Sequence, residues 1–391
     1  MIKVLLIAAY PIQNAAPHRL LAEDNRLHVD TVYLSDPSVK LSKGKEFINQ
    51  SQFDIKVLDD TYRWQLLRNW APRPSLSNFW GLINPALFSL VPKYDCIVVY
   101  GHAYASFWMA ILTALVLRRK LIFTTDATYL EAPDGKAWKQ NLKKQFLPFL
   151  YNRLADAIWV PSTESKLFLE SLHVKSEKIV VTPYTVDHDF FLMHRHKISK
   201  EEIREKYNIP IGSILLVFCA KFIARKRPQD ALIALQKAYQ ADVYLLMIGD
   251  GPMRTELEQL AFTLRVEEKV KWVGLVKYSD LPSHYSASDI LIFTSETEQF
   301  GLPVNEAMLC ELPVIISDRL GCRHDLVKEG ENGYTYKCGN TDELASRIKQ
   351  LANDSEKRIQ MAHKSAELIQ NWSPSVNAQA KAASILRLFH K

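Results

Sequence analysis

The sequence predicts an α/β protein built from two doubly wound domains. Short runs rich in β-branched and aromatic residues alternate with helical patterns, and this alternation occurs in both halves of the chain. Several of the runs are apolar throughout, which is typical of parallel strands covered by helices on both faces. A length of 391 residues accommodates two such domains, and an apolar share of 48% is enough for two full cores.

The expected elements follow one another in a regular order. The first half contains predicted strands at Lys3–Ala8, Leu27–Tyr33, Cys96–Tyr100, Lys120–Thr124 and Ala157–Pro161. The second half contains predicted strands at Ser213–Ala220, Val243–Ile248, Val270–Val273, Ile290–Thr294, Pro313–Ser317 and Gly333–Tyr336. Helical patterns separate the later strands at Pro228–Ala241, Met253–Leu264, Tyr278–Ala287, Pro303–Cys310 and Asp342–Asn353.

The break between the domains is expected between Pro183 and Ser199. The charged stretch His194-Arg-His-Lys favours a linker there, followed by a polar helix over Lys200–Tyr207. We therefore expect an N-terminal domain over 1–185 and a C-terminal domain over 186–373. A last helix over 374–391 continues past the second domain, and packing back on the first domain is one arrangement open to it.

Composition limits the classes of partner. The net charge of +6 fits an anionic small molecule or a membrane surface, but the chain lacks the concentrated basic runs of a nucleic-acid binder. The five cysteines are widely spread and form no CxxC pair, which indicates reduced thiols rather than disulfides or a metal site. The longest apolar stretch, Ala103–Leu117, is shorter than the ~20 residues of a membrane span and predicts a buried helix. We expect a cytoplasmic protein, with peripheral contact to the inner face of a membrane left open.

Ligands of doubly wound domains lie at the carboxyl ends of the strands, so the residues that follow each strand are the candidates. Four cations, Lys221, Arg225, Lys226 and Arg227, follow the first strand of the second domain, and the Pro228 helix begins directly after them. A helix N-terminus preceded by cations suits a diphosphate. A solvated basic loop is the alternative.

Other strand ends of the second domain carry turn and carboxylate residues. Gly249 and Gly251 form a tight turn that either approaches a ligand or is a plain turn. Gly274 offers a backbone edge for a nucleobase. Glu298 and Glu306 lie on either side of a strand-to-helix turn, with Glu306 expected in the first helical turn. Two such carboxylates can reach hydroxyls at two heights on one ligand.

Together these motifs resemble glycosyltransferase family 4, a group of retaining enzymes with the GT-B fold of two facing Rossmann-like domains and a cleft between them. The resemblance is carried by Ala220-Lys221-Phe222 with Lys226-Arg227, Gly249-Asp-Gly-Pro252, Glu298-Gln-Phe-Gly-Leu-Pro303 with Glu306-Ala-Met308, and Glu331-Asn-Gly333. It covers nearly all of the second domain and is diffuse in the first.

The resemblance implies roles for individual residues. Lys226 would contact the donor diphosphate, Glu298 the donor sugar and Glu306 the ribose. Lys221 stands where the family has arginine, which loses a bidentate fork. Further donor-binding positions are Gly249, Gly251, Gly274, Phe300, Gly301 and Leu302. The chain departs from the family where Gln299, Ala220 and Arg227 replace glycines.

The first domain offers weaker candidates. Asn14, after the first strand, and Asp126, after the strand over Lys120–Thr124, are candidates for the acceptor side. His102 follows the strand ending at Tyr100, and the resemblance implies a catalytic position for it near the reacting sugar. His102 is equally compatible with a structural role, and Asp126 with a helix cap. Lys136, Lys139, Lys143 and Lys144 beside an apolar stripe suggest either a surface helix or one that lies on anionic lipid. Arg63, Trp64, Arg68, Trp70 and Arg73 form a second basic and aromatic cluster.

The sequence therefore predicts a retaining glycosyltransferase that moves a sugar from a UDP- or GDP-sugar to a hydroxyl of a sugar, lipid-linked or small-molecule acceptor in glycan, polysaccharide or glycolipid synthesis. We expect no cofactor and no metal, because lysine and arginine can take the place of Mg²⁺ at a diphosphate. A hydrolase or epimerase of the same fold and a non-catalytic nucleotide-sugar-binding module remain alternatives. A nicotinamide-dependent dehydrogenase is disfavoured because no G-x-G-x-x-G follows the first strand.

Overall fold

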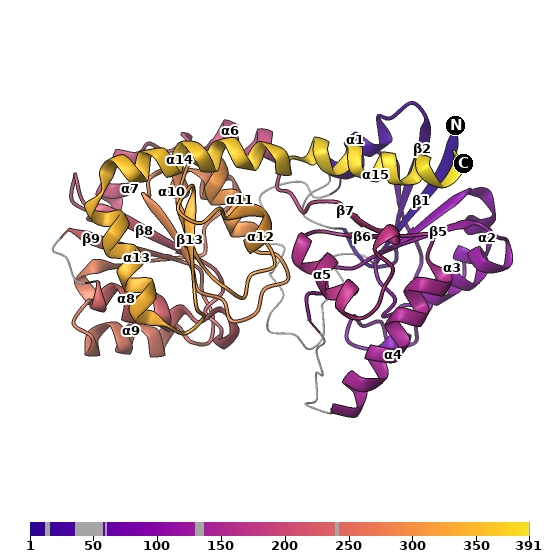
Figure 1. The fold of residues 1–391 in the computed structure, drawn as a ribbon, viewed down its shortest axis with the longest axis horizontal. Helices are drawn as coiled ribbons and strands as arrows, with labels where there is room; N and C mark the ends of the chain where they lie inside the picture. Colours follow the sequence, from indigo (N-terminus) through magenta and orange to yellow (C-terminus); the bar gives the residue numbers. More distant parts are fainter. Residues whose placement is uncertain (12–15, 36–57, 59–60, 130–136, 239–241, 391) are drawn as a thin grey trace. The chain divides into compact units, whose positions relative to one another are not determined.

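The computed structural model describes residues 1–11, 16–35, 58, 61–129, 137–238 and 242–390, and leaves the side chains of 137–140 undescribed. The chain forms two compact units (Figure 1). Unit 1 comprises Met1–Ser51, Lys56–Tyr184 and Pro374–Lys391. The described residues of unit 2 lie within Thr185–Ser373.

Unit 1 is built on a seven-stranded sheet in the order β3-β2-β1-β4-β5-β6-β7, in which every recorded pairing is parallel. Its strands are β1 (Ile2–Ala8), β2 (Leu27–Tyr33), β3 (Trp64–Leu66), β4 (Cys96–Val99), β5 (Lys120–Thr124), β6 (Ala157–Val160) and β7 (Ile179–Val181). The order reverses between β1 and β4. Ligand sites of doubly wound sheets lie at the carboxyl ends of the two strands that flank such a reversal.

Helices cover both faces of the unit 1 sheet. Alternate residues of β1 enter different cores, Leu5 and Ile7 one and Val4 and Leu6 the other. The first core is closed by α2 (Leu87–Leu90), α3 (Ala105–Val116), α4 (Ala137–Leu154) and α5 (Thr163–Ser171). The second is closed by α1 (Ala16–Ala22) and by the C-terminal helix α15 (Pro374–Phe389). The last helix of the chain is therefore part of unit 1.

Unit 2 has a six-stranded parallel sheet in the order β10-β9-β8-β11-β12-β13. Its strands are β8 (Ile214–Cys219), β9 (Val243–Ile248), β10 (Val270–Gly274), β11 (Ile290–Phe293), β12 (Val314–Ser317) and β13 (Gly333–Tyr336). The order reverses between β8 and β11, so the carboxyl ends of these two strands are where a ligand site of this fold is expected.

The helices of unit 2 form two layers around its sheet (Figure 1). One core lies under α8 (Pro228–Lys237), α9 (Arg254–Thr263) and α13 (Thr341–Asn353). The other lies under α6 (His188–His194), α10 (Leu281–Ser286), α11 (Leu302–Leu309) and α12 (Arg323–Leu326). Helix α7 (Lys200–Lys206) precedes β8, and α14 (Ser355–Ile369) follows α13.

The expected linker was wrong over part of its length. The segment His188–His194 is helix α6, whose N-terminus is capped by the Asp187 carboxylate accepting the amide of Phe190 at 3.1 Å. Phe191 is fully buried in a unit 2 core. This stretch is therefore an integral helix of unit 2, because its apolar residues have a core to enter.

Three further general features concern the described residues. All five cysteines are free thiols. Within the described ranges, no helix combines the length and apolar character needed to cross a membrane. The helix predicted near Ala103–Leu117 is confirmed as α3, but only one of its faces is buried, since Leu112 and Val116 are 55% and 81% exposed.

Candidate functional site

The loops that follow β8 and β11 are tied together at the reversal of the unit 2 sheet. The Thr294 hydroxyl, just after β11, donates to the carbonyl oxygens of Lys226 and Arg227, at 2.8 Å each. The amide of Glu296 donates to the carbonyl of Arg225 at 2.8 Å. These bonds hold the basic loop and the glutamate-bearing loop in a fixed relation, as expected for residues at neighbouring carboxyl ends.

Lys226 and Glu298 form an ion pair across these two loops. Their side chains are only 12% and 18% exposed, and the ammonium also lies 5.3 Å from the centre of the Phe293 ring. Burial lowers the pKa of the Lys226 ammonium, and the neighbouring Glu298 carboxylate partly offsets that effect. The structure thus brings together the two side chains that the sequence assigned to diphosphate and sugar, and it shows them bound to each other.

The Arg227 side chain binds a carboxylate of its own segment, although its place in the basic loop suggests a cation available for a ligand. Its guanidinium binds Asp230 with two hydrogen bonds, of 2.7 and 3.0 Å, and Asp230 is 2% exposed. The Asp230 carboxylate occupies the first turn of α8, where an anion is favoured by the helix dipole. Arg227 also has a left-handed backbone, with φ of 48°, at the position where the family has glycine. Arg227 is therefore committed to the fold of the loop.

The turn at Gly249 and Gly251 is explained by packing within the protein. A Cβ at Gly249 would lie 2.0 Å from the carbonyl oxygen of Ala220, and one at Gly251 would lie 2.5 Å from that of Phe222. The two segments are also hydrogen bonded, since the Phe222 amide donates to Asp250 at 3.0 Å. These glycines let the turn after β9 press against the loop that begins at half-buried Lys221. Gly274 has a φ of +75° and open space around its Cα.

The backbone of the glutamate loop is fixed by a second segment that the sequence did not single out. The amide of Gly321 donates to the carbonyl of Glu298 at 2.9 Å, and the amide of Cys322 donates to that of Phe300 at 3.0 Å. A Cβ at Gly321 would lie 1.9 Å from the carbonyl oxygen of Gln299. Gly321 is thus required for this close approach. Its signal in the sequence was an isolated glycine shortly after a predicted strand.

Gly301 is the N-cap residue of α11 and has a left-handed backbone, with φ of 114°. Leu302 is the first residue of the helix. Phe300, before the turn, is buried at 3% exposure.

The sequence predicts Glu306 in the first turn of its helix, and this prediction is wrong. The first turn of α11 contains no acidic residue, and Glu306 lies further along the helix. It is 8% exposed, and its Oε2 accepts a hydrogen bond of 2.9 Å from the hydroxyl of Tyr285. Burial raises the pKa of Glu306 to about 7, while the hydrogen bond from Tyr285 lowers it. The carboxyl group therefore titrates near neutral pH.

In unit 1, His102 and Asp126 follow the adjacent strands β4 and β5. The His102 ring faces Tyr151 edge-on at 6.3 Å, and its Nδ1 has no hydrogen-bond partner among the described residues. Burial and the nearby charge of Lys143 lower the pKa of His102, which keeps the imidazole neutral. Asp126 accepts a hydrogen bond of 3.4 Å from the Tyr184 hydroxyl, and its position ahead of α4 does not match the cap of that helix, which begins at Ala137. Both remain candidates at one edge of the sheet.

Several sequence candidates lie on the surface or outside the described residues. Asn14 and Lys136 are outside them, and the side chain of Lys139 is not described. Lys143 and Lys144 are exposed on α4. In the second cluster, the Arg68 guanidinium stacks 5.0 Å from the ring of Trp70, which is 63% exposed.

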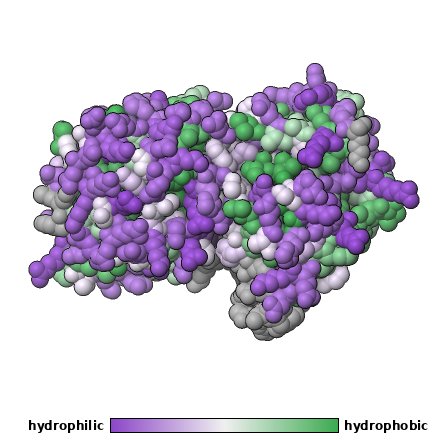
Figure 2. Space-filling view, viewed as in Figure 1, coloured by the Kyte–Doolittle hydropathy of each residue, from purple (hydrophilic) through white to green (hydrophobic). Residues whose placement is uncertain are grey.

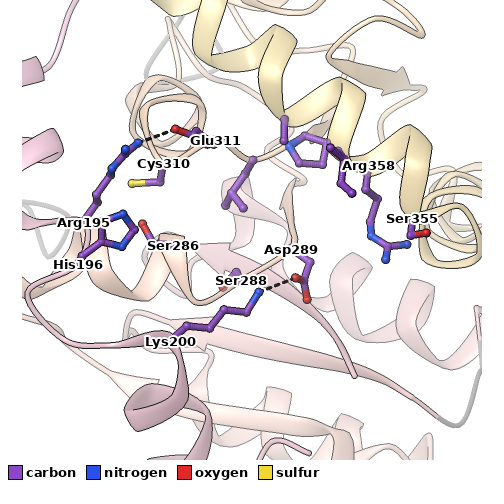
Figure 3. A pocket seen from close by; sticks show the side chains of 14 residues that line it. Arg195, His196, Lys200, Ser286, Ser288, Asp289, Cys310, Glu311, Ser355 and Arg358 are labelled. Carbon is purple, nitrogen blue, oxygen red and sulfur yellow. Dashed lines mark hydrogen bonds and ion pairs between the residues drawn. The ribbon is translucent and has the colours of Figure 1, made fainter. Parts of the chain in front are cut away.

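Figure 3 shows a separate pocket of about 350 Å³ in unit 2. Asp289 and Pro313 in its lining precede β11 and β12, so the pocket lies at the amino edge of the sheet. Its charged side chains are largely paired with one another, Arg195 with Glu311 at 2.7 Å and Lys200 with Asp289 at 3.0 Å. None of the predicted donor residues lines it. The candidate site is therefore the carboxyl edge that carries Lys226 and the two glutamates.

Two family models match the chain. The model described as "Glycosyl transferases group 1" matches residues 199–368, and the one described as "Glycosyltransferase Family 4" matches residues 45–190. The first therefore contains every donor-side candidate named above, and the second contains His102 and Asp126.

Relatives of known name and solved structures agree with these models. N-acetyl-alpha-D-glucosaminyl L-malate synthase of Bacillus anthracis is 30% identical over 198 residues, which is 50% of each chain. Alpha-monoglucosyldiacylglycerol synthase of Streptococcus pneumoniae is 29% identical over 41% of this chain and 37% of its own. The chain spans about half the length of the first curated relatives it matches.

The fold extends over the whole chain. The structure of Anabaena Alr3699/HepE in complex with UDP has a TM-score of 0.75 at 20% identity and covers 99% of this chain and 100% of its own. A glycosyltransferase from Rickettsia africae gives 0.76 at 16% identity, over 100% and 99% of the two chains. This chain, with its two Rossmann-like sheets of seven and six parallel strands, thus has the GT-B type of fold. With both halves matched by its models, the chain belongs to glycosyltransferase family 4.

Proposed function

We propose that the protein is a retaining, metal-independent glycosyltransferase that moves a sugar from a nucleoside-diphosphate sugar to an acceptor hydroxyl. The observation that supports this most strongly is the buried Lys226–Glu298 ion pair at the reversal of the unit 2 sheet. A cation and a carboxylate that are held together at this edge can serve the two ends of one donor, the diphosphate and the sugar. The membership of the family supports the same assignment.

The donor side follows from the position of each group. The Lys226 ammonium would stabilise the negative charge that develops on the diphosphate as the bond from the sugar C1 to the phosphate oxygen breaks. Glu298, already in contact with Lys226, would accept hydrogen bonds from sugar hydroxyls, and Glu306 would bind the ribose. Arg227 takes no part in this proposal, because Asp230 holds its guanidinium.

The acceptor side is assigned to unit 1. An acceptor hydroxyl would form its bond to C1 on the face that the diphosphate leaves, and its proton would pass to the departing phosphate oxygen. His102 is a neutral imidazole at a strand end, so it can accept a hydrogen bond from a sugar hydroxyl. Asp126 at the neighbouring strand end is a second acceptor-side candidate.

The names of relatives support the class of substrate. Solved structures of Anabaena Alr3699/HepE contain UDP and UDP-glucose, and one curated relative is a diacylglycerol glycoside synthase by name. We therefore propose a UDP-sugar ahead of a GDP-sugar as donor and a sugar or lipid acceptor. Thermal stabilisation by a panel of nucleotide sugars would identify the donor directly.

Replacing Lys226 tests the central assignment. Lys226→Ala should lower kcat/KM at least ~100-fold, the scale for loss of a preorganised charge at a developing anion. Lys349→Ala, at an exposed position of α13 in the same unit, is the matched control and should retain activity. Near-normal turnover by the Lys226 variant would disprove its role.

Two measurements test the finer points of the mechanism. NMR of the first-formed product should show the anomeric configuration of the donor, and the opposite anomer would refute retention. Activity should persist in excess EDTA. Loss of activity in EDTA with recovery on adding Mg²⁺ would refute metal independence.

We also propose that α4 contacts anionic lipid at a membrane surface. Leu142 and Phe149 are each 59% exposed on this helix, beside the exposed Lys143 and Lys144. Figure 2 shows more hydrophobic surface on the visible face of unit 1 than on that of unit 2. Apolar and basic side chains exposed on one helix are suited to the interface of an anionic bilayer.

Vesicle binding tests this contact. The protein should co-sediment with vesicles containing phosphatidylglycerol and not with neutral phosphatidylcholine vesicles. Lys143→Glu with Lys144→Glu should abolish that binding, whereas Lys337→Glu with Lys349→Glu makes the same change of charge on unit 2. Equal binding by both double variants would reject α4 as the contact.

A further inference from the structure

Glu306 is held by one specific side chain of a neighbouring helix. Tyr285, on α10, is fully buried, and its hydroxyl donates to Oε2 of Glu306 at 2.9 Å. The described part of the chain places no hydrogen bond on the other carboxyl oxygen, Oε1. The two oxygens of this carboxyl group therefore have different surroundings.

The other groups that face Glu306 are neutral. The Cys219 thiol, at the end of β8, interacts with Tyr285, and burial raises the pKa of this thiol to about 12. Burial likewise raises the pKa of Cys310, the residue after α11, to about 12, and that of Tyr278, ahead of α10, well above its usual value. Among the described residues, Glu306 has no ion pair. Tyr285 is thus the contact that stabilises the carboxylate form.

We propose that Tyr285 is a positioning residue for the nucleotide: its phenol fixes Oε2 of Glu306 and leaves Oε1 to bind the ribose hydroxyls of the donor. This inference rests on the proposed function, which makes Glu306 the ribose ligand. A side chain that is anchored on one oxygen presents the other in one orientation, so less conformational entropy is lost when the ligand binds.

A pH dependence of donor binding follows from the same contact. A carboxylate accepts hydrogen bonds from two ribose hydroxyls more strongly than a protonated carboxyl group does. Because burial raises the pKa of Glu306 to about 7, donor affinity should fall as the pH decreases through that value. Removing the Tyr285 hydroxyl removes the contact that lowers this pKa. The loss of affinity should then begin at a higher pH.

Tyr285→Phe tests the proposal by calorimetry with UDP-glucose and GDP-mannose between pH 6 and 9. These diphosphate diesters are used because they have no ionisation of their own near pH 7. We expect the better probe to bind about 10- to 150-fold more weakly at pH 7, the scale of a hydrogen bond to a charged group, with the midpoint of the pH profile shifted upward. The turnover number at saturating donor should change little.

Three comparisons separate the possible failures. Tyr334→Phe removes a hydroxyl that accepts a hydrogen bond of 2.9 Å from Gln350, and it should leave the pH profile unchanged. If Glu306→Gln binds both probes normally, or if the wild-type protein binds neither, the proposed function is overturned. If Glu306→Gln is impaired while Tyr285→Phe retains the wild-type affinity and profile, the inference about Tyr285 alone is overturned.

A measurement on the wild-type protein covers the case in which Tyr285→Phe does not fold. At pH 7, where a group with a pKa of about 7 is half protonated, binding of the probe should release up to about half a proton per site, because Glu306 becomes a carboxylate in the complex. Calorimetry in buffers of different ionisation enthalpy measures that proton, and Glu306→Gln should abolish its release. Absence of proton release by the wild-type protein would overturn the inference.

Discussion

Lys381 provides a quantitative test of how α15 is bound to unit 1. Its side chain is buried at 6% exposure between the sheet and the helix. The ammonium nitrogen lies 3.4 Å from the Tyr100 hydroxyl and 5.5 Å from the centre of the Trp159 ring. No carboxylate pairs with it among the described residues. A cation in such surroundings is poorly solvated, so the neutral amine is favoured.

The size of the effect follows from linkage. Burial lowers the pKa of Lys381 from 10.5 to about 7. Between these two values the unfolded chain binds a proton that the folded chain does not, so the stability supplied by the neutral amine is complete above pH 10.5 and is lost progressively down to pH 7. At about 1.4 kcal/mol per pH unit, the whole loss is about 5 kcal/mol.

Lys381→Met removes the titrating group and retains an apolar side chain of similar length. The Tyr100 hydroxyl keeps its hydrogen-bonding partner His18, whose Nε2 lies 3.0 Å away. We therefore expect the variant to be more stable than the wild type at pH 7, by up to about 5 kcal/mol. This advantage should shrink by about 3 kcal/mol between pH 7 and 9.5, because the wild type recovers stability over that interval.

Hydrogen exchange of α15 and β6, combined with urea unfolding at several pH values, measures this difference within unit 1. Lys349→Met, at an exposed position of α13, is the matched control and should show no change with pH. A stability difference between the wild type and Lys381→Met that is constant with pH would refute the reasoning, because it would mean that the amine has the same pKa in the folded and unfolded chains. A less stable variant at pH 7 would refute it equally.

Three further predictions concern the donor loops. The Glu298 carboxylate raises the pKa of Lys226, which burial lowers, so Glu298→Gln should lower that pKa further. The alkaline limb of the pH profile of kcat/KM should then move to lower pH. An unmoved limb would contradict the pairing of the two side chains. Arg227→Gly relieves ~1–2 kcal/mol of strain from the left-handed backbone, but it leaves the buried Asp230 carboxylate unpaired, at a larger cost. Urea unfolding should therefore show that the free energy of unfolding falls by about 2 kcal/mol. A stabilised variant would show that the strain outweighs the ion pair. Gly251→Ala would place a Cβ 2.5 Å from a backbone oxygen of the neighbouring loop and should lower Tm and weaken binding of UDP-glucose; unchanged values would indicate that the loop can move.

Much of the sheet architecture could be predicted because parallel strands buried on both faces leave strong local signals. The strands Leu27–Tyr33, Lys120–Thr124, Val243–Ile248 and Gly333–Tyr336 were predicted with the bounds that the structure has. The sheet-edge strands β3 and β7 were missed, since three residues are too few to show a period.

Helix α6 was missed for a different reason. The charged residues around His194 outweighed a usable signal, namely Asp187 as an N-cap before a run of apolar residues. The cap and the apolar run are both local features. A reading that gave them more weight than the charges would have found the helix.

Some contacts of the candidate site could be predicted from local sequence patterns, whereas others depend on tertiary packing. That Lys226 and Glu298 meet follows from the rule that carboxyl ends of neighbouring parallel strands share an edge, so the sequence was sufficient for it. The side chains that control them were not accessible in this way. Tyr285 precedes Glu306 by 21 residues on another helix, and its hydroxyl reaches the carboxyl group only through the packing of α10 against α11.

The position of a proposed ligand contact in this chain is therefore encoded by strand order, whereas its protonation state depends on side-chain packing that no short motif records. Glu306 illustrates the difference. Its place after β11 could be read from the sequence, but its pKa of about 7 arises from full burial, offset by one hydrogen bond from Tyr285. The same holds for Lys381, whose helix was predicted and whose burial was not. Substitutions at such packed partners should therefore change the pH dependence of the protein while the motif that identifies its family stays intact.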